Sequence, residues 1–264
     1  MSGWFERYQQ GFYQEVYDEL LAMKEQVFEK PVYQEASLVA RSMMSRVRDN
    51  IALLIPRLKT LGYELVDGDW SSYWEQAEYP EPELNELLRA YREPPLQTPA
   101  FLQEIGQRVG ALPLAVRCWY EEVGSVNLIG TFPKTAARKE LSYELDPLLI
   151  LPVDCLLEQF PFETPEEWEE ARNEDGTFNL DLAVDADLKY NISGSGGYFI
   201  QTPCNAFDTT FDLLGYYHHA PSPTFINYLR TCFRWGGFFG LSAQNRPTLT
   251  PDELAFLTED FLAF

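Results

Sequence analysis

Apolar side chains recur every three or four positions near the start of the chain, which is the spacing of an amphipathic helix. One such stripe covers residues 5–27, and Pro31 is expected to end its helix. A second stripe covers residues 44–58, where Pro56 is expected to kink or shorten the helix. Together with shorter helical stretches that follow, these stripes predict a helical N-terminal region over residues 1–110.

Helix starts further along the chain are marked by threonine and proline. A threonine before the first turn accepts hydrogen bonds from free backbone N–H groups, and proline suits the first helical position because that position needs no N–H group. At two starts a glutamate three residues later completes a capping box. The expected starts lie at Thr98, Pro113, Thr164, Ser222-Pro223-Thr224 and Thr250, and the capping boxes are those of Thr164 and Thr250.

After residue 124 the pattern changes to short β-branched and aromatic runs divided by Gly, Pro, Asn or Asp, which is typical of strands. The chain is therefore expected to be an α+β protein. Its helical N-terminal third would pack on a mixed, mostly antiparallel sheet region over residues 111–264, with one continuous core. The runs that predict strands of one sheet are 126–132, 148–156, 182–192, 197–203 and 207–215.

Charge is spread unevenly along the chain. The sequence holds 41 acidic and 20 basic residues, a formal net charge of −21 at pH 7. Residues 1–60 hold eight of each, which leaves 33 acidic against 12 basic residues beyond them. Such a surface repels nucleic acid and anionic membranes and attracts basic proteins. Solubility alone is the competing explanation of the same charge.

The densest acidic run spans residues 158–187, with eleven acidic residues and one basic residue, Arg172. Self-repulsion at this density is costly and favours a surface for a basic partner, although a solvated helix face has the same composition. Trp168 is either an anchor for that partner or a residue that packs the helix onto the sheet. The candidate partner-binding residues are Glu163, Glu166, Glu167, Trp168, Glu169, Glu170, Asp175, Asp181 and Asp185.

The sequence indicates no catalytic residue, cofactor or metal ion. The glycine-rich stretch 192–197 precedes a strand-like run instead of a helix, so it predicts a hairpin turn and not a phosphate loop. His218 and His219 are adjacent and cannot easily share one metal ion. The four cysteines form no CxxC pair and are expected to be buried free thiols.

Apolar residues make up 45% of the chain, which is enough for a folded core. No apolar run has the length needed to span a bilayer, and the first ten residues lack the basic start and apolar core of a signal peptide. The chain is therefore expected to be cytoplasmic.

Three segments, LPLAVRCWYEEVGSVNL at 112–128, DPL at 146–148 and FINYLRTCFRWGGF at 225–238, together resemble the SUKH superfamily. That group includes fungal cell-wall assembly regulators and many bacterial immunity proteins. The usual Asn-Gly-Gly turn of the family appears here as Val-Gly-Ser at 123–125, and residues 1–97 lie outside the resemblance. The resemblance implies an α+β sheet fold and, for the bacterial members, a cytoplasmic antidote that binds a toxin domain, often a nuclease.

The resemblance and the charge together favour a non-enzymatic protein-binding module, an immunity protein of a toxin–antitoxin pair. A nuclease toxin is basic because it holds phosphates, so an inhibitor that covers it should be acidic and rich in aromatic anchors. A scaffold or regulatory protein of the same fold is the first alternative, and an enzyme on an unfamiliar α+β scaffold is the second. The partner, its binding surface and the oligomeric state stay open.

Overall fold

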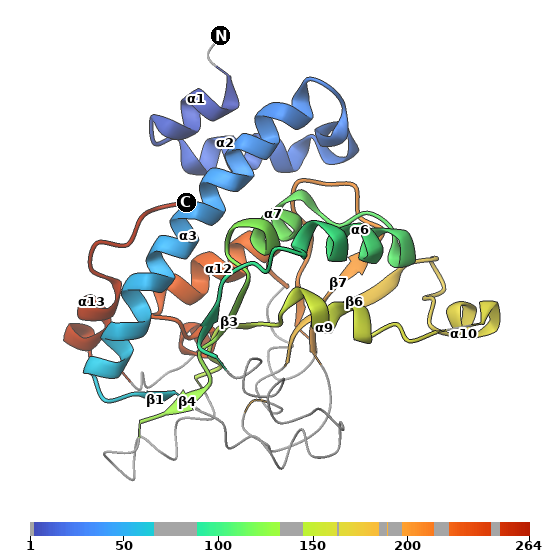
Figure 1. The fold of residues 1–264 in the computed structure, drawn as a ribbon. Helices are drawn as coiled ribbons and strands as arrows, with labels where there is room; N and C mark the ends of the chain where they lie inside the picture. Colours follow the sequence, from blue (N-terminus) through green and yellow to red (C-terminus); the bar gives the residue numbers. More distant parts are fainter. Residues whose placement is uncertain are drawn as a thin grey trace.

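The computed structural model describes residues 3–65, 89–132, 145–162, 164–184, 189, 197–213, 222–243 and 249–264. Over these residues the protein has an α+β fold, with helices in its N-terminal part and small antiparallel sheets after them. The first helices lie at one end of the molecule, and the long helix α3 runs from them along one side (Figure 1). None of the helices in these ranges combines the length and the apolar character needed to cross a membrane.

The first apolar stripe forms three short helices instead of the single helix predicted over residues 5–27. They are α1 (Trp4–Gln9), α2 (Tyr13–Ala22) and the 3-10 helix η1 (Lys24–Phe28). The chain turns at Gly11, whose φ of +98° is left-handed and favours glycine. A second change of direction falls at Lys24, whose φ is +50°. The spacing of the apolar residues continues across both turns, so the pattern alone does not reveal them.

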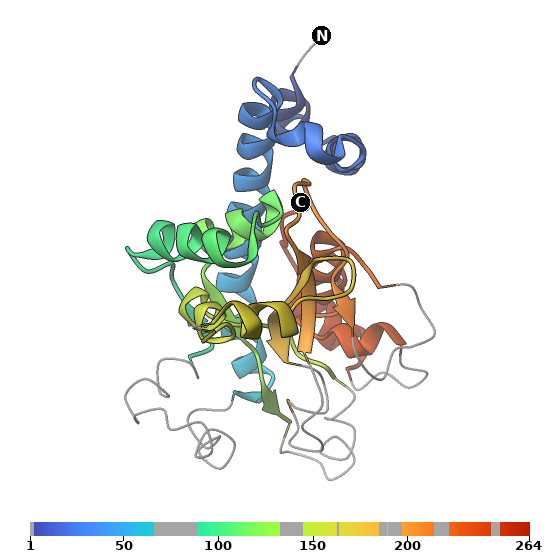
Figure 2. The same ribbon diagram turned by 90° about the vertical axis from the view of Figure 1, so that its right-hand side faces the viewer.

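Helix α3 (Val32–Thr60) starts earlier than predicted and is not ended by Pro56. It has 29 residues, and α1 and α2 lie at its N-terminal end, above the rest of the molecule in Figure 2. Pro56 lies in the last turns, and the helix continues through it to Thr60. The apolar stripe of α3 is buried, with Met44, Ile51 and Leu58 all shielded from solvent.

The predicted helix starts are confirmed in most details. Thr164 and Thr250 each form a complete capping box, and the Thr224 side chain accepts a hydrogen bond from the Asn227 amide. Thr98 is itself the first helical residue, with Gln97 in the capping position. The later helices are α6 (Thr98–Val109), α7 (Leu114–Glu122), α9 (Val153–Glu158), α10 (Pro165–Glu170), α12 (Phe225–Arg234), η3 (Phe239–Ala243) and α13 (Pro251–Thr258).

The strands form three small antiparallel sheets within the described residues, in place of the one sheet predicted. Their orders are β1-β4, β2-β3-β5 and β6-β7-β8, and the last two are joined by a hydrogen bond of 2.7 Å from Leu151 N to Leu182 O. The run 148–156 is a strand only in its first half, since Pro152 precedes α9. The strands are β1 (Glu64–Leu65), β2 (Tyr91–Arg92), β3 (Ser125–Asn127), β4 (Gly130–Thr131), β5 (Leu149–Ile150), β6 (Phe178–Val184), β7 (Gly197–Thr202) and β8 (Asp212–Leu213).

Helix α7 ends at Glu122, and Gly124 turns the chain after it. Its φ of +93° is left-handed, and its amide donates a hydrogen bond of 3.0 Å to the Trp119 carbonyl. A Cβ at this position would lie 2.2 Å from the Arg92 carbonyl oxygen of the neighbouring strand β2, so only glycine fits. The chain then enters β3, which pairs with β2 and β5.

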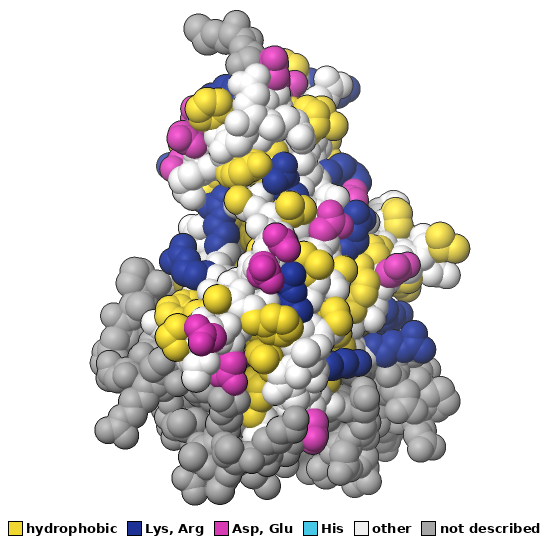
Figure 3. All heavy atoms as spheres, turned by 90° about the vertical axis from the view of Figure 1, so that its left-hand side faces the viewer, with side chains coloured by type: hydrophobic (Ala, Val, Ile, Leu, Met, Phe, Trp, Pro, Cys, Tyr) yellow, Lys and Arg dark blue, Asp and Glu magenta, His cyan; other side chains and the backbone are white. Residues whose placement is uncertain are grey.

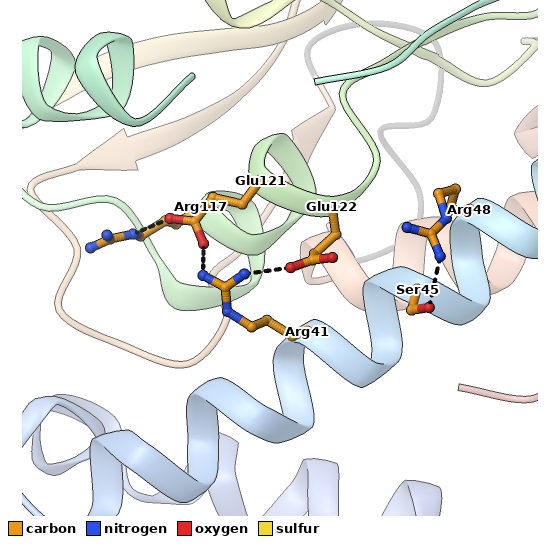
Figure 4. Close-up of polar contacts among 6 residues, drawn as sticks. All are labelled: Arg41, Ser45, Arg48, Arg117, Glu121 and Glu122. Carbon is orange, nitrogen blue, oxygen red and sulfur yellow. Dashed lines mark hydrogen bonds and ion pairs between the residues drawn. The ribbon is translucent and has the colours of Figure 1, made fainter. Parts of the chain in front are cut away.

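An arginine fastens α3 to α7. The Arg41 guanidinium bridges the carboxylates of Glu121 and Glu122 (Figure 4). Arg48, two turns further along α3, instead donates to Ser45 of its own helix at 3.1 Å. Arg41 is therefore a contact between two elements, whereas Arg48 is a contact within one.

Candidate partner-binding face

The helix that carries the predicted acidic site, α10, is fixed at its start by a capping box. The Thr164 hydroxyl accepts a hydrogen bond from the Glu167 amide at 3.3 Å, and the Glu167 carboxylate accepts one from the Thr164 amide at 2.9 Å. Pro165 takes the first helical position. Glu166 and Glu167 lie in the first turn, where the partial positive charge of the helix end favours them.

Trp168 holds α10 against the sheet region. Its ring is half-buried and stacks on Phe160, with the ring centroids 6.0 Å apart and the planes at 11°. It meets Phe162 and Phe178 edge-on at 5.2 and 5.6 Å. These contacts support the packing role for Trp168, and its use as a partner anchor stays a prediction. Because the ring fixes the helix, the neighbouring carboxylates are held in a defined arrangement.

Helix α10 lies at the edge of the molecule opposite α3 (Figure 1), and the acidic residues on it and near it in the chain are exposed. Arg172 is the one basic residue in the described part of the run 158–184. It pairs with Glu169 at 3.3 Å and lies 4.7 Å from the centre of the Phe178 ring. We call this set the acidic face: Glu158, Glu166, Glu167, Glu169, Glu170, Glu174, Asp175 and Asp181.

Two carboxyl groups of the acidic face titrate differently from ordinary aspartates. The side chain and amide of Thr177 donate to Asp175 at 2.6 and 3.0 Å, which lowers the pKa of Asp175. Asp181 is exposed as a residue, but its carboxyl group lies against Gly197 on β7, and this local burial raises its pKa. Asp175 is thus firmly ionised at neutral pH, while Asp181 holds its proton to a higher pH.

The structure places seven of the nine predicted partner-binding residues. Trp168 is half-buried, while Glu166, Glu167, Glu169, Glu170, Asp175 and Asp181 are exposed. Glu163 and Asp185 lie outside the described residues. The sequence prediction did not include Glu158 and Glu174, although both belong to the same acidic run and are exposed.

None of the four cysteines, all of which lie in the described ranges, has a thiol whose pKa is lowered by its surroundings. All four are free, with Cys118 and Cys232 buried and Cys155 and Cys204 half-buried. Burial raises the pKa of Cys118 and of Cys155 to about 12, so both thiols are protonated at neutral pH. His218 and His219 lie outside the described residues, as does most of the glycine-rich stretch 192–197.

No group of three or more His, Cys, Asp and Glu side chains that could hold a metal ion occurs in the described ranges. The residues of the acidic face are exposed, although the Asp181 carboxyl group lies against Gly197. What the arrangement can do chemically is to present fixed negative charge to a cationic surface.

The structure also contains a buried ionic cluster that the sequence analysis did not predict. Lys189 is 1% exposed, and its ammonium group donates to the Asp146 carboxylate at 2.6 Å and to the Pro147 carbonyl at 2.8 Å. The Tyr198 hydroxyl also donates to Asp146. Asp146 precedes β5 in the chain. Nothing in the pattern around Lys189 distinguishes it from a surface lysine, because its partner lies 43 residues away.

Comparison with known proteins gives no further guide: no protein-family model, curated protein or solved structure matches this chain.

Proposed function

We propose that this protein is a non-enzymatic binding protein of the SUKH type, an immunity protein that covers a basic, nuclease-like toxin domain. The acidic face carries the proposal. Its residues are exposed, its helix α10 is held by the capping box of Thr164 and the packing of Trp168, and Arg172 is the one basic side chain in the described part of the run.

Charge complementarity explains how such a surface would act. A nuclease concentrates Lys and Arg where it holds phosphates, so a rigid negative face attracts the same surface that binds nucleic acid. Exposed charges mainly speed association and are screened by salt, whereas buried contacts set the dissociation rate. The acidic face would therefore steer the encounter and block the nucleic-acid site by occupying it.

The test is capture of the partner followed by measurement of its association rate. Full-length protein is used to capture partners from its native cells, and the captured protein is identified and purified. The variant Glu166→Gln, Glu167→Gln, Glu169→Gln and Glu170→Gln should associate with it about tenfold more slowly at low salt. Its rate should also depend less on salt, as measured by stopped-flow fluorescence. Glutamine keeps the capping box at Glu167, so the helix is retained.

A matched control changes the same net charge at the other end of the molecule. Glu6, Glu15, Glu25 and Glu29 are exposed in or directly after the N-terminal helices, and their replacement by glutamine should leave the association rate unchanged within about twofold. Equal slowing by both variants would mean that only total charge matters. A captured partner that is acidic, or a stable cellular assembly without a toxin domain, would contradict the immunity function.

A further inference from the structure

Residues 259–264 follow α13 on the side of the molecule that carries α3 and the C-terminus, at the left of Figure 1. The chain turns at Asp260, whose φ is +59°, and residues 261–264 form neither helix nor strand. The two aromatic side chains of this segment lie three positions apart and pack on the same residue. Phe261 and Phe264 meet the Phe233 ring of α12 edge-on, at centroid distances of 5.6 and 5.7 Å. Phe264 is 6% exposed, so its ring is an anchor.

Three polar side chains of α3 bind the backbone of this segment. Arg57 donates to the Glu259 carbonyl, Asn50 to the Leu262 carbonyl at 2.9 Å, and Arg46 to the Ala263 carbonyl at 3.1 Å. Positions 46, 50 and 57 lie on one face of a helix. Their partners follow in the opposite order along the chain, so the segment runs antiparallel to α3. Arg230 of α12 donates to the Phe264 main-chain oxygen at 2.8 Å from the other side.

Asn50 makes the contact most typical of peptide recognition. Its amide group donates to the Leu262 carbonyl, and its side-chain oxygen accepts from the Leu262 amide at 2.7 Å. Asn50 is fully buried beneath the segment, whereas the Leu262 side chain is 41% exposed. This pair of bonds therefore recognises the backbone of residue 262 and not its side chain, as main-chain contacts do where proteins bind extended peptides.

We propose that α3 and α12 form a peptide-binding surface, made by Arg46, Asn50, Arg57, Arg230 and Phe233, which residues 259–264 occupy in cis. Main-chain hydrogen bonds supply affinity there, and the pair of phenylalanine contacts supplies specificity. The ligand class is a short acidic peptide with two aromatic residues three positions apart. A partner peptide of this kind displaces residues 259–264 and binds in their place.

Charge favours an acidic ligand on this surface. Three of its five residues are arginines, and the Arg57 guanidinium lies 3.9 Å from the Asp260 carboxylate of the bound segment. Figure 3 shows this side of the molecule, where Lys and Arg side chains lie among apolar and acidic ones. The acidic face lies on the opposite side, so the two surfaces select partners of opposite charge.

The experiment uses a fluorescent peptide with the sequence of residues 257–264 and the full-length chain. In the variant Phe261→Ala and Phe264→Ala the segment loses its anchors and leaves the surface free. The peptide should bind this variant at least about tenfold more tightly than the wild-type chain, as measured by fluorescence anisotropy. Adding Asn50→Ala to the variant should weaken binding by about tenfold, because two backbone hydrogen bonds are lost.

Two controls separate docking from general effects. Leu262→Ala removes an exposed side chain but keeps the bonds to Asn50, so this chain should bind the peptide as weakly as the wild type does. A peptide with alanine at both phenylalanine positions should not bind any of the chains. The proposal is overturned if the double-phenylalanine variant is folded by circular dichroism and shows no saturable binding, or if Asn50→Ala leaves binding unchanged.

A second measurement covers the case in which the double-phenylalanine variant does not fold. Hydrogen exchange of the wild-type chain is followed by mass spectrometry with and without excess peptide. Displacement should speed exchange of the backbone amides in residues 259–264 by about tenfold while other amides keep their protection. Unchanged exchange of that segment at saturating peptide would overturn the proposal independently of any variant.

Discussion

At the scale of single residues, Lys189 and Asp146 form an ion pair that is buried on both sides. Both side chains are fully shielded, and Asp146 also accepts a hydrogen bond from Tyr198. Lys189→Met should lower the free energy of unfolding by about 3–5 kcal/mol, because it leaves the Asp146 carboxylate buried without its cation. Urea unfolding followed by tryptophan fluorescence measures the change.

A double variant tests whether the loss comes from the unpaired charge. Asp146→Asn combined with Lys189→Met removes both charges, and asparagine tolerates the left-handed φ of +44° at position 146. This chain should regain about 2 kcal/mol or more relative to Lys189→Met alone. If the double variant is less stable than the single variant, the pair acts through packing and not through charge.

At the scale of elements, the contact between α3 and α7 offers a matched pair of arginines. Arg41→Ala should lower the free energy of unfolding by about 0.5–1 kcal/mol, because it breaks the bridge to Glu121 and Glu122. Arg48→Ala should cost less, since Arg48 bonds to Ser45 of its own helix. The difference should shrink in about 1 M salt, where the screening length falls to about 3 Å. Equal losses at both positions would contradict the interhelical role of Arg41.

The elements also show where the sequence is a sufficient guide. The capping boxes at Thr164 and Thr250 were predicted correctly because both partners lie within four residues of each other. The strand predicted over residues 148–156 was wrong in its second half, since a short apolar run fits a strand and a buried helix equally well. The break at Gly11 was missed because the apolar spacing continues through it.

The acidic face was partly predictable, again because its residues lie close together in the sequence. Its carboxylates are close in sequence, so their density was visible without a structure. The rings that fix Trp168 come from the segment between α9 and α10 and from β6, and their meeting depends on how the chain folds back. The pairing of Lys189 with Asp146 and the docking of residues 259–264 on α3 depend entirely on such long-range packing.

At the scale of the whole molecule, a buried polar junction links α2 to the segment between β7 and β8 and to the start of α12. The Tyr17 hydroxyl of α2 donates to the Asp208 carboxylate at 2.9 Å and lies 2.6 Å from the Thr224 hydroxyl that caps α12. The bonded residues are 191 and 207 positions apart in the chain. Asp208 also accepts from the amides of Thr209 and Ile226, at 2.8 and 3.0 Å.

Burial raises the pKa of Asp208, although the donors around its carboxylate oppose that shift. The folded protein therefore binds this proton more tightly than the unfolded chain, and the contribution of Asp208 to stability falls as the pH rises above about 4. Tyr17→Phe removes a donor to the carboxylate, so it should raise the pKa further and deepen this fall. We expect a loss of about 1–3 kcal/mol at pH near 7 and a smaller loss at pH near 4.5, measured by urea unfolding. An equal loss at both pH values would show that the hydroxyl serves Thr224 and leaves the charge of Asp208 unaffected.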